Sequence, residues 1–303
     1  MVRAGSAGPR RGRWSALTRE ERLGYRLLLP PLAILVIVVT YPFVLAVAQS
    51  LQGRDGAFVG LTNYGRAISS PGLGGAIVAT ATYAAIVLPT QILGGLGLAL
   101  LVERVVRSTA LRAVLYALAI VPIVIPPVAV GVIARLLYGP NYGALSYILE
   151  SVGLVQKEIL WLSTPLGAMF AVASVDIWQW TPFVYLVLFA GLQTVPRESV
   201  EAAQVDGATG WDRFRHIELP YLRPLLLLVL FFRIADVLRV FDHVFVLTGG
   251  GPGSTTQFLS LYIYRIAFKF SDASQAAALA VMVMIVMTIG YSIITRLLPL
   301  ERD

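Results

Sequence analysis

The stretch EAAQVDGATGWDRFRHIELPYLRP, from Glu201 to Pro224, is a charged, glycine-punctuated segment between two almost uninterrupted apolar runs, 166–193 and 224–247. A run of about 20 apolar residues is enough to cross a bilayer as a helix. The polar residues between the two runs therefore predict a loop outside the membrane. At about 30 residues this loop is long for a connector without a role of its own.

The composition of the whole chain indicates a protein that folds in lipid. Of its 303 residues, 57% are hydrophobic and 14% are charged, whereas soluble domains carry about 25% charged residues. The absence of cysteine excludes disulfides and thiolate metal sites, and two histidines, His216 and His243, argue against a zinc enzyme. The net charge of +7 does not indicate a nucleic-acid partner, because the basic residues are not gathered on one soluble patch.

The apolar runs predict an all-α integral membrane protein with six transmembrane helices. We place these helices near 27–51, 76–102, 113–138, 166–193, 224–247 and 277–295. The segments 1–26, 103–112, 194–223 and 296–303 hold sixteen of the 24 Lys and Arg residues, and the three alternate segments hold five. Because cytoplasmic loops carry the excess of Lys and Arg, we expect both termini and the loop 194–223 in the cytoplasm.

This organisation predicts a single membrane domain with short extensions. Residues 1–26 form a basic cytoplasmic segment, in which the capping-box spacing of Thr18 and Glu21 predicts a short surface helix near 18–28. Residues 27–298 form the six-span domain, and 299–303 form a cytoplasmic tail. We expect a multi-pass protein of the bacterial cytoplasmic membrane.

Within the loop, the residue order predicts two short helices joined by a glycine turn. The first helix runs from Pro196 to about Asp206 and ends at Gly207, which can adopt the left-handed conformation. The second begins after Thr209, and Pro220 is expected to end it. The alternative interpretation is a solvated amphipathic connector with no partner. We call residues 194–223 the module.

The spacing EAA-x3-G-x9-I-x-L-P in this module resembles the EAA signature of the permease subunits of bacterial ABC importers. The matching residues are Glu201, Ala202, Ala203, Gly207, Ile217, Leu219 and Pro220. Asp206, Ala208 and Phe214, with LTGGGP at 247–252 and YIYRIAF at 262–268, are similar to the carbohydrate-uptake branch. The resemblance covers about residues 120–300, and before that the agreement lies mainly in the span pattern.

The resemblance implies a division of labour among several subunits. A second, similar permease would complete the pathway, two ATP-binding subunits would lie beneath the pair, and an extracytoplasmic binding protein would deliver the solute. The resemblance assigns coupling to the ATP-binding subunits to Glu201, Ala202, Ala203, Asp206, Gly207, Ile217, Leu219 and Pro220. We therefore call residues 194–223 the coupling module from here on. Neither Lys157 nor Lys269 fits a Walker A pattern. We therefore expect no catalytic residue, metal or cofactor here, with ATP and Mg bound by the partner subunits.

The expected function is uptake of a carbohydrate, such as trehalose or another disaccharide. An importer for a sugar phosphate such as glycerol phosphate is the alternative within the same class. A self-sufficient six-span channel or secondary transporter is the alternative from another class, although neither would need the EAA module.

Ionisable residues inside an apolar run are costly and default to a functional hypothesis. Arg233, Asp236 and Arg239 follow one another at i+3 steps in the fifth run. They form either an internally neutralised ladder or part of the solute pathway, where a maltose-type relative has smaller neutral groups. In the fourth run the candidates are Gln179, Trp180 and Phe183, since aromatic faces stack on sugars; weaker candidates are Thr90, Gln91 and Arg135.

Overall fold

The structure is a computed structural model, and it describes residues 18–140, 143–154 and 159–297. In these ranges the chain is helical, and an isolated bridge between Gln52 and Phe58 is the extended pairing that occurs. Residues 1–17 of the predicted N-terminal segment and the whole predicted tail, 299–303, lie outside the described residues.

Four helices in the described ranges are long and apolar enough to cross a membrane: α1 (Arg19–Ser50), α3 (Pro71–Val105), α7 (Pro165–Leu192) and α13 (Ala273–Leu297). A fifth span is formed by α4 (Thr109–Val124) and α5 (Pro127–Tyr138), if this bent pair counts as one. The surface helix expected near 18–28 is the start of α1, which continues from Arg19 to Ser50 without a break.

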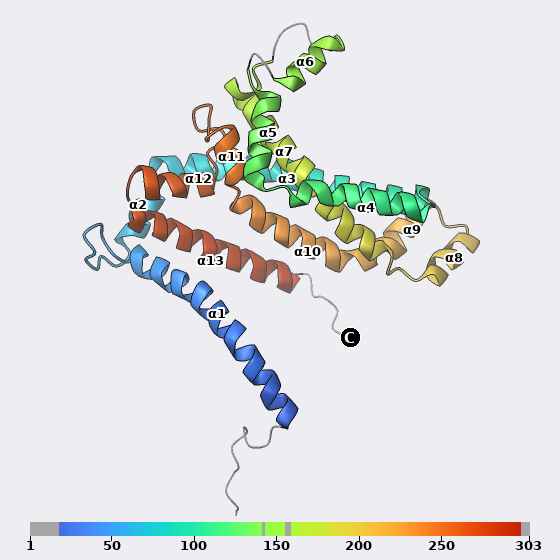
Figure 1. Cartoon of the computed structure of the whole chain (residues 1–303), viewed down its shortest axis with the longest axis horizontal. Helices are drawn as coiled ribbons and strands as arrows, with labels where there is room; N and C mark the ends of the chain where they lie inside the picture. The colour runs from blue at the N-terminus through green and yellow to red at the C-terminus, as the bar shows by residue number, and fades with distance from the viewer. Residues whose placement is uncertain (1–17, 141–142, 155–158, 298–303) are drawn as a thin grey trace, which may run out of the picture.

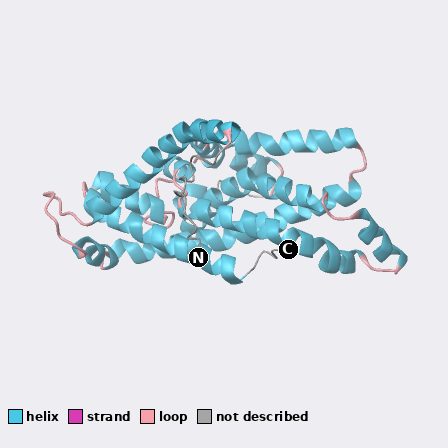
Figure 2. Ribbon diagram, turned by 90° about the horizontal axis from the view of Figure 1, so that it is seen from below, coloured by secondary structure: helices cyan, strands magenta, loops and turns pink. Residues whose placement is uncertain are grey.

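Shorter elements connect these helices. They are α2 (Thr62–Ile68), α6 (Ala144–Ser151), the 3₁₀ turn η2 (Trp161–Ser163), α8 (Arg197–Val205), α9 (Gly210–Arg213), the π-helical turn η3 (Phe214–Glu218), α10 (Leu219–Leu238), α11 (Asp242–Leu247), α12 (Leu259–Tyr264) and the π-helical turn η4 (Arg265–Lys269). α3, α4, α7, α10 and α13 run in roughly one direction, while α1 leads away from them (Figure 1). Seen from below, the helical body is elongated (Figure 2).

The third predicted span is not one straight helix. α4 and α5 meet at an angle of 93°, and Ile125 between them has extended backbone angles. Ile125 precedes Pro126 and Pro127, and a residue before proline is driven out of the helical region. The two prolines also lack the N–H groups that would continue the helix. The break is therefore fixed by the sequence at this point.

The fifth predicted span also differs from the expectation. Pro220 does not end the second module helix, because α9, η3 and α10 form one continuous helical path. The π turn closes with the Leu219 N–H bonded to the Phe214 carbonyl, and Pro220 follows directly, at a point where the π turn has already interrupted the regular α-helical hydrogen bonding. α10 ends at Leu238, and α11 follows after a short interruption.

The core holds α3 tightly against α7. Gly95 allows this approach, because a Cβ at this position would lie 2.6 Å from the Cβ of Val184. Val184 and Leu188 on α7 are fully buried against α3 and α10, in a cluster that also contains Ala99 and Leu222. This packing places the polar residues of α3, α7 and α10 next to one another inside the bundle.

Candidate functional sites

The first candidate site is a cluster of charged and amide side chains between α3, α7 and α10, centred on Arg233. The Arg233 side chain is 1% exposed, and its Nη2 lies 2.7 Å from Oδ2 of Asp176 on α7. Its Nε donates to Oε1 of Gln91 on α3 at 2.8 Å, and its Nη1 lies 3.3 Å from Oδ2 of Asp236. Gln91 in turn donates to the Asp176 carboxylate at 2.9 Å. The Arg233 guanidinium thus joins three helices.

One face of this cluster is more open. The guanidinium carbon of Arg233 lies 5.0 Å from the centre of the Trp180 ring, and Trp180 meets Phe183 edge to face. Asp236 is 26% exposed and pairs with Arg239, whose side chain is 74% exposed. Trp180, Phe183, Asp236 and Arg239 therefore combine aromatic faces with hydrogen-bonding groups, the combination that carbohydrate hydroxyls and C–H surfaces need.

Gln179, another predicted pathway residue, is placed differently. Its side chain is fully buried, and its Nε2 donates to the Ile125 carbonyl at 2.9 Å. This carbonyl lies at the break between α4 and α5, where it has lost its helical partner. Among the described residues, the Oε1 atom of Gln179 has no hydrogen-bond partner. Gln179 on α7 thus supplies a hydrogen-bond donor to the carbonyl exposed at the break between α4 and α5.

Of the weaker pathway candidates Thr90, Gln91 and Arg135, one is buried in the Arg233 cluster and two are exposed. Gln91 belongs to the buried cluster, while Thr90 is exposed and bonds the carbonyl one turn back at Ile86. Arg135 is exposed and donates to the Val246 carbonyl at 3.4 Å. Sequence reasoning missed Asp176 as the main partner of Arg233, although a lone carboxylate inside the apolar run 166–193 was a signal for it.

The second candidate site is the coupling module, whose two helices are capped as expected. α8 ends in a Schellman motif: the Ala208 N–H bonds the Ala203 carbonyl at 2.9 Å, and the Gly207 N–H bonds the Gln204 carbonyl at 3.1 Å. Gly207 adopts a φ of 76°. α9 begins with a capping box between Thr209 and Asp212, and the hydrogen bonds from the Thr209 side chain and backbone lower the pKa of Asp212.

The residues of the EAA signature divide into an exposed set and an anchoring set. Glu201, Ala202, Asp206 and Gly207 are exposed, and Ala203 is half-buried. Ile217 and Leu219 are half-buried where the module joins α10, and Pro220 is exposed. α8 and α9 lie together at one end of the molecule (Figure 1). The acid and the first alanine are thus available to a partner.

Replacing Gly207 with valine is expected to loosen the end of α8. A Cβ at Gly207 would meet nothing within 4 Å, so the cost is backbone strain at positive φ, about 1–2 kcal/mol or more for a β-branched residue. Local opening of the module should then increase roughly five- to thirtyfold. The rate of tryptic cleavage at Arg197, Arg213 and Arg215 measures this opening. Gly65→Val, at a helical glycine with equally open surroundings, should leave the rate unchanged.

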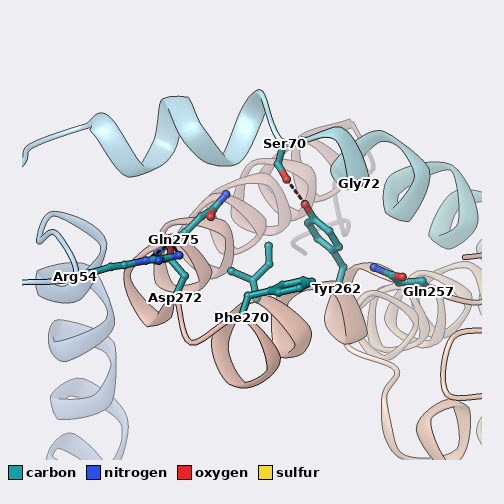
Figure 3. Close-up of a pocket in the computed structure, with 9 residues that line it drawn as sticks. Arg54, Ser70, Gly72, Gln257, Tyr262, Phe270, Asp272 and Gln275 are labelled. Carbon is teal, nitrogen blue, oxygen red and sulfur yellow. Dashed lines mark hydrogen bonds and ion pairs between the residues drawn. The ribbon is translucent and has the colours of Figure 1, made fainter.

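A third polar cluster lies at the other side of the molecule, around a cavity of about 590 Å³ (Figure 3). Asp272, 1% exposed, accepts from Arg54 at 2.7 Å and from Arg66 at 2.8 Å. The Ser70 and Tyr262 hydroxyls are bonded to each other. The cluster ties the α1–α2 loop and α2 to the start of α13. Because these polar groups are already paired, we interpret the cluster as a structural link between these segments. We call Asp272, Arg54 and Arg66 the Asp272 clasp.

The Asp272 clasp predicts a pH-dependent contribution to stability. Burial would raise the pKa of Asp272, but hydrogen bonds from the Gln275 N–H, Arg54 and Arg66 outweigh it and hold the pKa below its ordinary value of 3.8. The contribution is therefore fully present above pH 4 and lost as the pH falls through the lower, folded-state pKa. Asp272→Asn should cost about 1–3 kcal/mol at pH 7. Thermal melts at pH 7 and pH 3 should show a deficit that shrinks in acid; an equal deficit at both would contradict this.

The described residues contain no group of three or more His, Cys, Asp or Glu side chains that could hold a metal ion. The apolar helices, the buried charges between them and the polar module outside them define the class of the chain as a multi-pass membrane protein. Residues 91–302 match the family described as "Binding-protein-dependent transport system inner membrane component". The chain belongs to this family of ABC transporter permeases.

Relatives match almost the full chain. The trehalose/maltose transport system permease protein MalF of Thermococcus litoralis is 34% identical over 282 residues, 91% of this chain and 93% of the relative. The trehalose transport system permease protein SugA of Mycobacterium tuberculosis is 30% identical over 272 residues, 87% and 84% of the two. A chain of the same fold occurs in the crystal structure of a bacterial alginate ABC transporter in complex with an alginate pentasaccharide-bound periplasmic protein. The TM-score is 0.78 at 24% identity, and the match covers 92% of this chain and 94% of that one.

Proposed function

We propose that this chain is a permease subunit of an ATP-driven importer that takes up a neutral carbohydrate, of which trehalose is the leading example. The observation that carries the proposal is the near full-length similarity, at 34% identity, to a permease named for trehalose and maltose transport. With a second permease it would form the pathway, a binding protein would deliver the sugar, and ATP-binding subunits would dock on the coupling module. The structural neighbour that was crystallised with a periplasmic protein supports the binding-protein partner.

The charge balance of the Arg233 cluster favours a neutral sugar over a sugar phosphate. Arg233 is neutralised by Asp176 and Asp236, and the exposed Arg239 also pairs with Asp236. A phosphate group is bound best by guanidinium groups whose charge is free to meet it. In the cluster as described, each arginine already faces a carboxylate. The open face with Trp180 and Phe183 suits stacking on a sugar ring.

A six-span arrangement with both termini in the cytoplasm completes the proposal. To the four apolar helices and the bent α4–α5 pair, the proposal adds the α10–α11 segment as a sixth span. This segment carries Arg223, Arg233 and Asp236 and is therefore less apolar than the others. Arg233 and Asp236 are paired inside the bundle, which reduces the cost of placing them at membrane depth. The distribution of Lys and Arg supports placing the module in the cytoplasm.

Uptake by the reconstituted complex tests the proposal. Proteoliposomes should contain this chain, its sister permease and the ATP-binding subunits, with the cognate binding protein added outside. We expect ATP-dependent accumulation of radiolabelled trehalose and no accumulation of labelled glycerol phosphate. Accumulation of glycerol phosphate alone would support the sugar-phosphate alternative. Trehalose uptake by this chain without any ATP-binding subunit would indicate a self-sufficient transporter.

A further inference from the structure

A buried carboxylate lies at the base of the coupling module, at a position that the EAA signature leaves open. Glu218 stands between the motif residues Ile217 and Leu219, and its side chain is 9% exposed. Its Oε1 accepts from Nε of Arg213 at 2.9 Å, and its Oε2 accepts from Nη2 of Arg104 at 2.9 Å. A carboxylate in this position would be costly without its two guanidinium partners.

The two partners of Glu218 belong to different parts of the protein. Arg213 ends α9 within the module, whereas Arg104 belongs to the last turn of α3. Arg104 also reaches the Gly210 carbonyl at 3.4 Å. Both side-chain hydrogen bonds that join α3 to the module in the described residues thus come from Arg104. We call the three side chains Arg104, Glu218 and Arg213 the Glu218 clasp.

The last turn of α3 also contacts α4 and the residue that follows α7. Glu103, the neighbour of Arg104, lies 3.3 Å from Arg112 at the start of α4 and accepts from Gln193, just after α7, at 3.2 Å. Arg112 also donates to the Val106 carbonyl at 2.7 Å. Since α3 is packed tightly along α7, a displacement of its last turn would be carried into the α3, α4 and α7 bundle.

We infer that Glu218 is a positioning residue that transmits movement of the coupling module to α3 through Arg104. The inference rests on the proposed function, in which the ATP-binding subunits move the module. α10 follows the module directly, because η3 joins them as continuous helix. α3 has no such chain connection: it packs against α10 deeper in the bundle, and the Glu218 clasp supplies its direct side-chain link to the module itself. Without the clasp, the last turn of α3 loses its two side-chain hydrogen bonds to the module, and movement of the module reaches α3 only through the packing of α10.

The ratio of sugar transported to ATP hydrolysed tests the inference in reconstituted complexes, with radiolabelled trehalose and the cognate binding protein. Glu218→Gln and Arg104→Gln should each lower this ratio about three- to tenfold. The double variant should be no worse than either single one, since both remove the same link. Arg104→Lys keeps the charge and should recover at least part of the ratio. Arg107→Gln, at an exposed arginine just after α3 and outside the coupling module, is the matched control and should match wild type.

The outcomes separate the clasp from the proposed function. A wild-type complex without ATP-dependent trehalose uptake would contradict the proposed function itself. If the wild type is active, an unchanged ratio in Glu218→Gln and Arg104→Gln would overturn the inference. A parallel fall in uptake, hydrolysis and thermal stability, at constant ratio, would also overturn it, because it would show a purely structural role. Additive losses in the double variant would show that the two residues act separately, against the inference.

Discussion

Replacing Arg233 with methionine is expected to destabilise the protein by about 3–5 kcal/mol, because it leaves a buried carboxylate without its counter-charge. The Asp176 residue is 3% exposed, and with Arg233 removed it would retain Gln91 as its side-chain partner. The measurement is denaturant or thermal unfolding of the purified protein in detergent. Loss of the contacts to Gln91 and Trp180 adds to the effect, since Arg233 joins α10 to both α3 and α7.

Two further variants show whether charge or packing is responsible. The double variant Arg233→Met with Asp176→Leu should recover much of the lost stability, since a buried ion pair can often be replaced by apolar groups of similar volume. Arg239→Met should cost less than about 1 kcal/mol, because Arg239 is largely exposed. If Arg233→Met instead abolished sugar uptake with unchanged stability, Arg233 would be a substrate-binding group and the structural interpretation would be contradicted.

Replacing Glu201 with lysine should reduce ATP-driven uptake at least about tenfold, since a charge reversal at a docking surface costs a few kcal/mol when it faces a cation. In the proposed complex, this acid would face a basic residue of the ATP-binding subunit. Glu201 is exposed, so folding of this chain alone should be unaffected. Uptake and co-purification of the ATP-binding subunit are measured together.

Ser199→Lys provides the control for Glu201→Lys. Ser199 is exposed on the same helix, and residues two apart on an α-helix point about 200° apart, so it lies on the other face from Glu201. It introduces the same cation without reversing the motif acid. Wild-type uptake in Glu201→Lys, or equal losses in both variants, would contradict a specific role for this side chain.

The sequence predicted the helical class and the module because these depend on local rules. Apolar runs of sufficient length form helices in lipid, and the order of Gly207, Thr209 and Asp212 specifies the caps found between α8 and α9. The 93° break at Ile125 was missed, although Pro126 and Pro127 mark it, because hydropathy alone does not distinguish a straight span from a bent one.

Long-range pairing is what the sequence could not provide. Arg233 was recognised as a costly charge, but its main partner, Asp176, is far away in the chain and is brought close only by the packing of α7 on α10. The same holds for Arg104 with Glu218 and for Arg54 with Asp272. The i+3 spacing of Arg233, Asp236 and Arg239 predicted a local ladder of ion pairs. The structure contains these pairs, and Arg233 also pairs with Asp176 on the neighbouring helix α7.

The most direct test of the proposed coupling uses the absence of cysteine from this chain. The variant Ala202→Cys is labelled with a photoactivatable benzophenone maleimide and assembled into the complex. Ala57→Cys, in the loop between α1 and α2, is labelled in the same way as the matched control. We expect the Ala202 adduct to cross-link to the ATP-binding subunit, with a yield that changes when ATP is added, and the Ala57 adduct to give no such cross-link. An active complex in which the Ala202 adduct gives no cross-link to the ATP-binding subunit would contradict docking of that subunit on the coupling module.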